Sequence, residues 1–536
     1  MAENERKQKQ RVADTLGLTL GKRMLSRRNF LGTGLAAGAC TRLLSQGRAD
    51  YSFSYSLAQK DWLDQGPFGI TQDDGWRTLS VTTPSRAPLR NFGLGLVGYT
   101  WEENGPALRV RKGLQTLEQA VEQMASLPFV DVLYVRCDWR DVQAAPGKLE
   151  LGPVWELTRD AARRHGLRFA FRIQLSNPQF EPKEIALPAF LRSKIPMVPI
   201  GHKQLDGREA SFAEPRYDHP AFQSAFRELN DLLAARFDGD PLLEWMDLMQ
   251  YGFWGEGHTS DLHNPFPDYF TAQQTFLRMT QYQLDTWKRT QLAVNTEPDI
   301  SSVGNAEVLD LAMRSGCWLR SDSIIDEEPI QIDQLANRPP WLAAVMEDGA
   351  HRDYDLKTIP VDSAGVNLRE NAMLHVLDLG ANYWSLWTEA ENLEQYNARF
   401  PEGFRALQQR MGYRIRPAWI WQRKRWGTEE LIVGVANDGV ASMPGVLRLT
   451  LESTDGAVRQ TGVLDPGQPF AGKIRQASLI LPPGLGAAEF KLTASLETKA
   501  DVRRPIHWAC AQHLNEDGSF PVHLKASDAP GWLKGV

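Results

Sequence analysis

Cysteine is scarce in this chain, and neither sign of charge dominates it. The four cysteines among 536 residues show no C-x-x-C spacing, which excludes a zinc knuckle and a disulfide framework. The 60 basic residues are scattered among 66 acidic ones and the formal net charge is −6, so no nucleic-acid partner is expected. With 42% hydrophobic and 24% charged residues, the composition is that of a soluble globular protein of two or three domains.

A long hydrophobic run is missing from the N-terminal region, where the apolar segment 32–39 is too short to span a bilayer. Arg27 and Arg28, followed by an aromatic residue and Leu, resemble the twin-arginine signal that exports folded proteins across the inner membrane. A basic helix end is the alternative. An A-x-A cleavage site precedes Cys40, which would attach the protein to a membrane if it were lipidated. We expect residues 1–49 to be a signal peptide with a linker, and the protein to be periplasmic or secreted.

From residue 92 onward, short β-branched or aromatic runs alternate with amphipathic stretches of helical period. Eight strands are predicted, at 92–99, 132–139, 167–174, 245–253, 292–296, 317–324, 341–346 and 382–387. Helices are predicted at 114–126, 154–165, 220–237, 269–289, 306–315, 368–379 and 404–411. These repeated βα units predict an α/β fold, a (β/α)8 TIM barrel over residues 92–412. The Pro-rich stretch 176–219 is expected to be an insertion on the active-site side.

Two further regions flank the predicted barrel. Residues 50–91 are polar with isolated aromatics, and we expect them to pack on the barrel as a leader. After residue 412 the helical period disappears, and short alternating runs are separated by Gly, Pro and Asp. This pattern predicts a small all-β sandwich over residues 413–536.

Seventeen tryptophans exceed what a core of this size ordinarily needs, and Trp stacks on sugar faces while donating one hydrogen bond. In barrels of this type the reacting groups lie at the C-terminal ends of the strands. Charged and aromatic residues stand together at four of the predicted strand ends, among them Arg136, Glu256, Glu347 and Trp387. These four strand ends are therefore the candidate site.

The strand ends resemble those of clan A glycoside hydrolases, in particular family 42 β-galactosidase-like barrels and a group of uncharacterised bacterial proteins with an appended β-sandwich. The most specific parts are Arg136 and Trp139 ahead of a Pro-Gly pair, and the run Trp254-Gly255-Glu256. The resemblance covers roughly the predicted barrel and implies an exported glycosidase.

In that clan, two glutamates carry the reaction, and the resemblance gives the acid/base role to Glu256 and the nucleophile role to Glu347. Gly255 stands where the clan usually has Asn, and Asp322 stands where a Tyr is usual. Barrel geometry supports the same pair, because strand ends three positions apart lie about 14 Å apart and two inward Glu side chains close most of that gap. A carboxyl separation of about 5 to 6 Å would suit retention of configuration, and the wider inverting geometry stays open.

The roles of Glu256 and Glu347 require different protonation states. The acid must be protonated near the working pH, which needs a pKa raised by burial or by a neighbouring carboxylate. Arg136 would keep the nucleophile ionised, although it could also be a structural ion-pair partner. Asp348 or Glu297 could be the second carboxylate in place of Glu347.

Aromatic and polar residues at or near the strand ends are the candidates for binding the substrate. They are Tyr99, Trp101, Arg136, Trp139, Trp254, His258, Glu297, Asp322, Trp384 and Trp387. His258 could orient a carboxylate or be exposed, and either of Trp384 and Trp387 could belong to the core. Cys137 and Cys317 lie on predicted strands and are expected to be reduced core residues.

Other barrel chemistries lack their characteristic residues. A metal-dependent hydrolase needs clustered His ligands, and the first, fifth and sixth predicted strands contain no His. A phosphate-binding barrel needs a Gly-rich loop after the last strands, where Gly349 and Gly380 are isolated. We therefore expect no metal or cofactor, and an oligo- or polysaccharide partner. The main rival function is a catalytically silent carbohydrate-binding barrel, and a structural envelope protein comes third.

Overall fold

The computed structural model describes most of the chain beyond its N-terminal region. The described residues are 76–101, 106–177, 186–205, 208–259, 262–296, 305–321, 324, 329–348, 368–425, 428–466, 474–483, 485, 488–499 and 501–525. The predicted export signal at 1–49 lies outside them, together with Cys40, Glu297 and Asp322.

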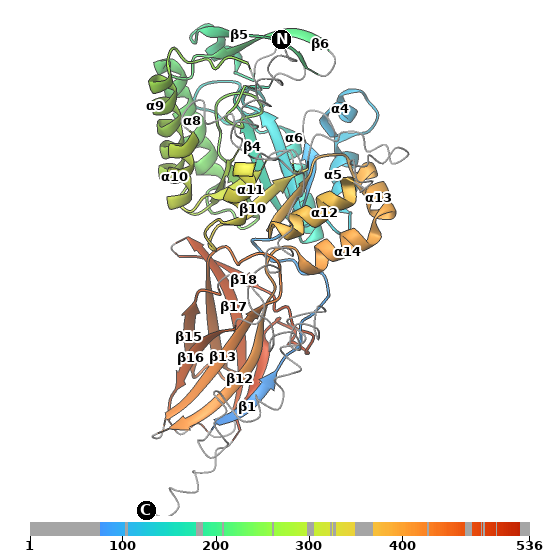
Figure 1. Cartoon of the computed structure of the whole chain (residues 1–536), viewed down its shortest axis with the longest axis vertical. Coiled ribbons are helices and arrows are strands. Elements are labelled where there is room, and N and C mark those ends of the chain that lie inside the picture. The colour runs from blue at the N-terminus through green and yellow to red at the C-terminus, as the bar shows by residue number, and fades with distance from the viewer. Residues whose placement is uncertain are drawn as a thin grey trace, which may run out of the picture. The chain divides into compact units, whose positions relative to one another are not determined.

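Eight parallel strands close into a barrel in the order β10-β11-β2-β3-β4-β7-β8-β9 (Figure 1). They are β2 (Gly95–Trp101), β3 (Val132–Asp138), β4 (Arg168–Gln174), β7 (Leu243–Asp247), β8 (Gln291–Asn295), β9 (Trp318–Ser321), β10 (Ala344–Glu347) and β11 (Tyr383–Leu386). The residue range of each strand overlaps that of one of the eight predicted strands, so the predicted TIM barrel is confirmed. The fourth predicted strand is the one with the largest error, because β7 ends six residues before the predicted end at 253.

Helices cover the outside of the barrel. They are α4 (Pro106–Arg111), α5 (Leu117–Ala125), α6 (Pro153–His165), α7 (Ala189–Arg192), α8 (Pro220–Phe237), α9 (Tyr269–Thr286), α10 (Asn305–Arg314), α11 (Pro329–Ala336), α12 (Leu368–Asp378), α13 (Ala390–Arg399) and α14 (Pro401–Arg410). Local signals fix their ends, such as the capping box of Thr116 with Gln119 before α5 and the left-handed Gly166 after α6. Four of these helices, α4, α7, α11 and α13, were not predicted. The sequence of α13 is mostly polar, and the helix buries only Ala390, Leu393 and Tyr396. Over the described part of the chain, no helix combines the length and hydropathy needed to cross a membrane.

Side chains alternate between the barrel interior and the helices. On β3, Tyr134 and Arg136 point inward, whereas Cys137 packs in the cluster under the helices. Four inward aromatics fill the barrel, with neighbouring ring centroids 4.8 to 6.2 Å apart, and they are Tyr134, Trp245, Trp318 and Tyr383. The interior is therefore a packed core, and the polar layer lies above it at the C-terminal ends of the strands. Cys137 and Cys317 are buried and free, which confirms the prediction for both.

The C-terminal region is all β, as predicted. One sheet has the order β1-β12-β13-β16, and the other has β15-β14-β17-β18 with β19 beside β17. The strands are β1 (Trp76–Val81), β12 (Ile415–Arg425), β13 (Thr428–Asn437), β14 (Val446–Ser453), β15 (Arg459–Leu464), β16 (Arg475–Leu481), β17 (Glu489–Lys499), β18 (Val502–Ile506) and β19 (Phe520–His523). Apolar side chains of both sheets share one buried cluster.

The predicted leader contains one described strand, which lies in the C-terminal sheet. β1 pairs antiparallel with β12, with Trp76 opposite Arg423 and Val81 opposite Trp419, so this strand belongs to the C-terminal sheet. The physical reason is the unpaired edge of β12, whose backbone N–H and C=O groups β1 satisfies. Sequence order alone does not reveal which edge a short N-terminal strand will join.

The Pro-rich insertion after β4 contains a two-stranded hairpin, β5 (Met197–Leu205) with β6 (Arg208–Pro215). Ile200 and Phe212 of this hairpin pack in one buried cluster with Phe253, which follows β7. The hairpin therefore contacts the loop that follows the C-terminal end of β7.

Candidate active site

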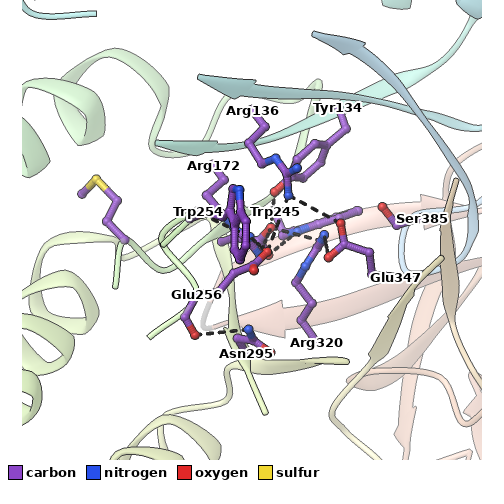
Figure 2. A network of polar contacts seen from close by, with 12 residues as sticks. Tyr134, Arg136, Arg172, Trp245, Trp254, Glu256, Asn295, Arg320, Glu347 and Ser385 are labelled. Atoms are coloured by element: carbon purple, nitrogen blue, oxygen red, sulfur yellow. Dashed lines mark hydrogen bonds and ion pairs between the residues drawn. The ribbon is translucent and has the colours of Figure 1, made fainter. Parts of the chain in front are cut away.

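Glu256 is placed by a tight turn rather than by a strand. Over residues 251–258 the backbone is left-handed at Gly252 (φ 81°), Trp254 (φ 55°), Gly255 (φ 72°) and Gly257 (φ 84°). The turn closes through hydrogen bonds from the Phe253 N–H to the His258 carbonyl at 2.8 Å and from the Gly257 N–H to the Tyr251 carbonyl at 2.9 Å. Three glycines make this path possible, since left-handed backbone is costly for other residues. The turn places the Glu256 side chain in a polar network with Arg136 and Arg172 (Figure 2).

Gly252→Ala should destabilise the protein by at least about 2 kcal/mol, because its Cβ would lie 2.0 Å from the His258 carbonyl oxygen. Gly255→Ala is the matched control, since its backbone is also left-handed but the nearest atom would be 3.4 Å away. It should cost only about 1 kcal/mol, the conformational cost alone. Urea unfolding of the two variants measures the difference, and equal losses would contradict this description of the turn.

Glu347 ends β10 and points into the same polar layer. Its Oε1 accepts a hydrogen bond from the Tyr99 hydroxyl at 2.9 Å, and its Oε2 lies 2.6 Å from Nη2 of Arg320. Glu256 is contacted by Nη1 of Arg172 through Oε1 and lies 3.3 Å from Nε2 of His258 through Oε2. Both carboxylates are buried.

One nitrogen of Arg136 links the two carboxylates. Its Nη1 is 3.5 Å from Oε1 of Glu256 and 3.6 Å from Oε1 of Glu347. These two oxygens therefore cannot be more than about 7 Å apart, a limit compatible with the carboxyl separation of retaining glycosidases. Figure 2 shows the two acidic side chains on either side of this guanidinium group.

Sequence reasoning missed the charges that complete this layer. Arg172 on β4 and Arg320 on β9 both contact Asp247, at 3.4 and 3.3 Å, and Asp247 also accepts hydrogen bonds from Tyr134 and Trp245. Three guanidinium groups thus face three carboxylates. The sequence did contain an indication of these residues, because Arg172 and Arg320 each lie within a short, mostly apolar strand. An arginine in such a strand is buried, and a buried charge requires a partner of opposite charge.

The arginines set the protonation of the pair. Burial raises the pKa of Glu256, but Arg172, His258 and Arg136 together outweigh it and hold that pKa far below its usual value. For Glu347, burial and the charge of Glu256 raise the pKa, yet Arg320 and Arg136 lower it overall. Both groups are therefore carboxylates at neutral pH. The raised pKa expected for a proton donor is not found on either of them.

Arg320→Met should lower the free energy of unfolding by about 3 to 5 kcal/mol, because it leaves Glu347 and Asp247 buried without their shared cation. Arg314→Met is the control, since the Arg314 ion pair with Asp310 is exposed and its loss should change stability by no more than about 0.5 kcal/mol. Denaturant unfolding compares the two. Similar losses would show that the buried arginine does not hold the acidic layer together.

Three of the predicted aromatic residues lie at the carboxylates. The guanidinium carbon of Arg136 is 5.8 Å from the Tyr99 ring centroid and 5.3 Å from that of Trp387. The Trp254 ring lies 5.5 Å from the His258 ring. Trp254 and Trp387 are half-buried, whereas Tyr99 is fully buried.

The structure does not bring the other predicted aromatics to the pair. Trp139 is fully buried, donates to Gln143 and packs edge-on against Phe222. Trp384 faces outward from β11 and packs against Tyr396 of α13. Trp101 is half-buried with the Arg111 guanidinium 5.9 Å from its ring centroid.

The other acidic candidates are placed as follows. Asp348 follows Glu347 and is buried, with its backbone N–H donating to the Ser385 carbonyl at 2.8 Å. Glu297 and Asp322 lie outside the described residues. In the described part of the chain, no group of three or more His, Cys, Asp or Glu side chains is arranged to hold a metal ion.

No protein-family model matches the chain, and no curated protein matches its sequence. Among solved structures, an exo-β-1,4-mannosidase from an Opitutaceae bacterium is 13% identical with a TM-score of 0.32, over 57% of this chain and 54% of that chain. The catalytic domain of a β-amylase from Paenibacillus polymyxa is 10% identical with a TM-score of 0.37, over 57% and 94%. A trimodular endoglucanase is 11% identical with a TM-score of 0.37, over 81% and 78%. The chain spans about half the length of the mannosidase.

Proposed function

We propose that this protein is a glycoside hydrolase that retains configuration, with Glu347 as nucleophile and Glu256 as acid/base. The observation that carries the proposal is the single guanidinium nitrogen of Arg136 within 3.6 Å of an oxygen of each carboxylate. This contact keeps the two groups close enough for one to attack a sugar carbon while the other serves the oxygen that leaves it. The half-buried rings of Trp254 and Trp387 offer faces on which a sugar could stack.

Glu347 has the surroundings that a nucleophile needs. Arg320 and Arg136 keep it ionised, and the Tyr99 hydroxyl fixes the orientation of its Oε1. An ionised, oriented carboxylate can attack the anomeric carbon and form an ester with the sugar.

Glu256 suits the second half of the reaction in its described state. Because Arg172 holds it as a carboxylate, it can take a proton from the water that hydrolyses the glycosyl ester. In the first half it must instead deliver a proton to the departing oxygen, and that proton has to reach it from another group. The same contact with Arg172 favours a second candidate function, a silent carbohydrate-binding barrel whose Glu256 is only an ion-pair partner.

A panel of nitrophenyl glycosides separates the two candidates. We expect release of nitrophenol from at least one sugar, and a first-formed product with the configuration of the substrate. The resemblance to family 42 barrels makes β-galactosides the first compounds to test. Binding of oligosaccharides without release from any aryl glycoside would favour the silent barrel, and a product of inverted configuration would exclude Glu347 as nucleophile.

Export by the twin-arginine route belongs to the same proposal, because an extracellular or periplasmic glycosidase meets polysaccharides there. Changing Arg27 and Arg28 together to Lys should leave the unprocessed precursor in the cytoplasm. Arg23→Lys, the same chemical change just outside the pair, is the control and should leave export normal. Fractionation with immunoblotting measures this, and normal export of the double variant would contradict the assignment.

A further inference from the structure

Asp247 is a buried carboxylate that the reaction described so far does not use. It is the last residue of β7 and lies on the same face of that strand as Trp245, two positions earlier. Its Oδ1 accepts a hydrogen bond from Nε1 of Trp245 at 2.9 Å, and its Oδ2 accepts one from the Tyr134 hydroxyl. The same Oδ2 lies 3.4 Å from Nη2 of Arg172 and 3.3 Å from Nη1 of Arg320. Four donors thus converge on one carboxylate.

In each of the two arginines, one amino group faces Asp247 and the other faces a reacting carboxylate. Nη1 of Arg172 contacts Oε1 of Glu256, while its Nη2 faces Asp247. Nη2 of Arg320 lies 2.6 Å from Oε2 of Glu347, while its Nη1 faces Asp247. Figure 2 shows Arg172 beside Glu256 and Arg320 beside Glu347. Asp247 is therefore connected to both glutamates, through a different arginine in each case.

The charge of Asp247 offsets a repulsion between the two arginines. The two nitrogens that share its Oδ2 cannot be more than about 7 Å apart, and two positive charges at that distance repel each other strongly where water is excluded. Arg172 comes from β4 and Arg320 from β9, while Asp247 comes from β7, which lies between these strands in the barrel. The carboxylate between the two guanidinium groups therefore fixes which nitrogen of each arginine faces its glutamate.

We propose that Asp247 is a positioning residue for both reacting carboxylates, because it holds Arg172 on Glu256 and Arg320 on Glu347. The inference rests on the proposed hydrolase function and adds a residue that the reaction requires. Asp247 itself touches neither the sugar nor the attacking water. Through Arg320 it keeps Glu347 ionised and oriented toward the anomeric carbon. Through Arg172 it keeps Glu256 where that group can activate water.

The first test is Asp247→Asn, which removes the charge and keeps the shape. The amide NH2 group must face at least one of the four donors, and the guanidinium groups lose the anion between them. With a nitrophenyl glycoside, the rate constants for formation and for hydrolysis of the glycosyl ester should both fall by about a hundred-fold per active site. Loss of both steps distinguishes this variant from Glu256→Gln, in which the first step stays nearly intact. Covalent labelling by a 2-deoxy-2-fluoro glycoside counts the active sites, so unfolded molecules do not affect the result.

The pH profile separates an effect of charge from an effect of packing. Burial raises the pKa of the Glu347 carboxyl, but the surrounding arginines lower it overall. The charged and titratable groups that face it are Arg320, Arg136, Arg172, Glu256 and Tyr99. In Asp247→Asn these arginines are no longer shared with a third carboxylate, so the pKa of Glu347 should fall further. The acidic limb of kcat/KM should therefore move to lower pH, whereas a variant that only loosens packing would leave that limb in place.

Two further variants serve as controls. Asp240→Asn breaks another buried ion pair, with Nη2 of Arg159 at 2.6 Å, ahead of the opposite end of β7. It should lower stability and leave both rate constants per active site unchanged. Tyr134→Phe keeps the charge of Asp247 and removes one of its hydrogen bonds, so both rate constants should fall by only about three- to tenfold. Because this variant keeps the buried ring, it decides the question even when Asp247→Asn does not fold, and unchanged rate constants would overturn the proposal.

A crystal structure of Asp247→Asn measures the positioning without any activity. We expect the guanidinium groups of Arg172 and Arg320 to lie farther apart than in the natural protein. If both arginines keep their places, or if both rate constants are unchanged, the positioning role is overturned and the hydrolase function stands. If the natural protein cleaves no glycoside, the hydrolase function fails and the role of Asp247 in the reaction fails with it. Separation of the arginines in the crystal would then still show that Asp247 holds them on Glu256 and Glu347.

Discussion

Glu347→Gln is expected to lower kcat/KM for every glycoside by at least about ten-thousand-fold, for good and poor leaving groups alike. The amide cannot form the glycosyl ester, and no other carboxylate in the described layer has the same combination of Arg320, Arg136 and Tyr99 around it. The side-chain shape is preserved, so the loss reflects chemistry and not packing. Steady-state kinetics with nitrophenyl glycosides measures the effect.

Two comparisons make the Glu347 result specific. Glu156→Gln removes a carboxylate from the exposed side of α6 and should leave the rate unchanged. In Glu347→Ala, which leaves space beside the anomeric carbon, azide should restore part of the reaction and give a glycosyl azide of inverted configuration. An active Glu347→Gln would show that another carboxylate, such as Glu297, is the nucleophile.

Glu256→Gln is expected to discriminate between leaving groups. With a poor leaving group, the loss of proton transfer should cost about a hundred- to ten-thousand-fold in kcat/KM. With a nitrophenol the first step should be nearly unaffected, and hydrolysis of the ester should become rate-limiting because no base activates water. Burst kinetics followed by a slow steady state would record this change.

The contact between Glu256 and Arg172 leads us to expect a change in stability as well as in activity. In Glu256→Gln the guanidinium of Arg172 loses a buried partner and retains Asp247 at 3.4 Å, so a moderate loss of stability should accompany the kinetic effect. A variant that loses equal activity on all leaving groups, or that loses stability and no activity, would identify Glu256 as an ion-pair partner of a silent barrel.

The barrel could be predicted from the sequence because period and length are local properties. Runs such as residues 132–139 read as buried strands, and helices such as α8 have clear ends, with Pro220 at the first turn. The turn at 251–258 could not be predicted. Its apolar residues continue the pattern of the preceding strand, so the pattern gives no indication that the three glycines reverse the chain there. The edge that β1 joins is likewise decided by tertiary structure.

The candidate site was predicted in part. Glu256, Glu347 and Arg136 were expected together and lie together, because the C-terminal ends of parallel strands converge in a closed barrel. Of the two tryptophans on the last predicted strand, Trp387 lies beside Arg136, whereas Trp384 on β11 faces outward by strand alternation. The burial of Glu214 beside the turn of Glu256, through Tyr217, could not have been predicted, since nothing in the insertion's sequence places that residue there.

The most direct test of the central claim is to trap the glycosyl ester. A panel of 2-deoxy-2-fluoro glycosides with good leaving groups slows the hydrolysis of such an ester more than its formation, and peptide mass spectrometry then locates the label. The account predicts one sugar per chain, bound to Glu347, and no labelling of Glu347→Gln. Turnover of the parent glycosides with the label on any other residue, or with no covalent label from any sugar of the panel, would contradict it.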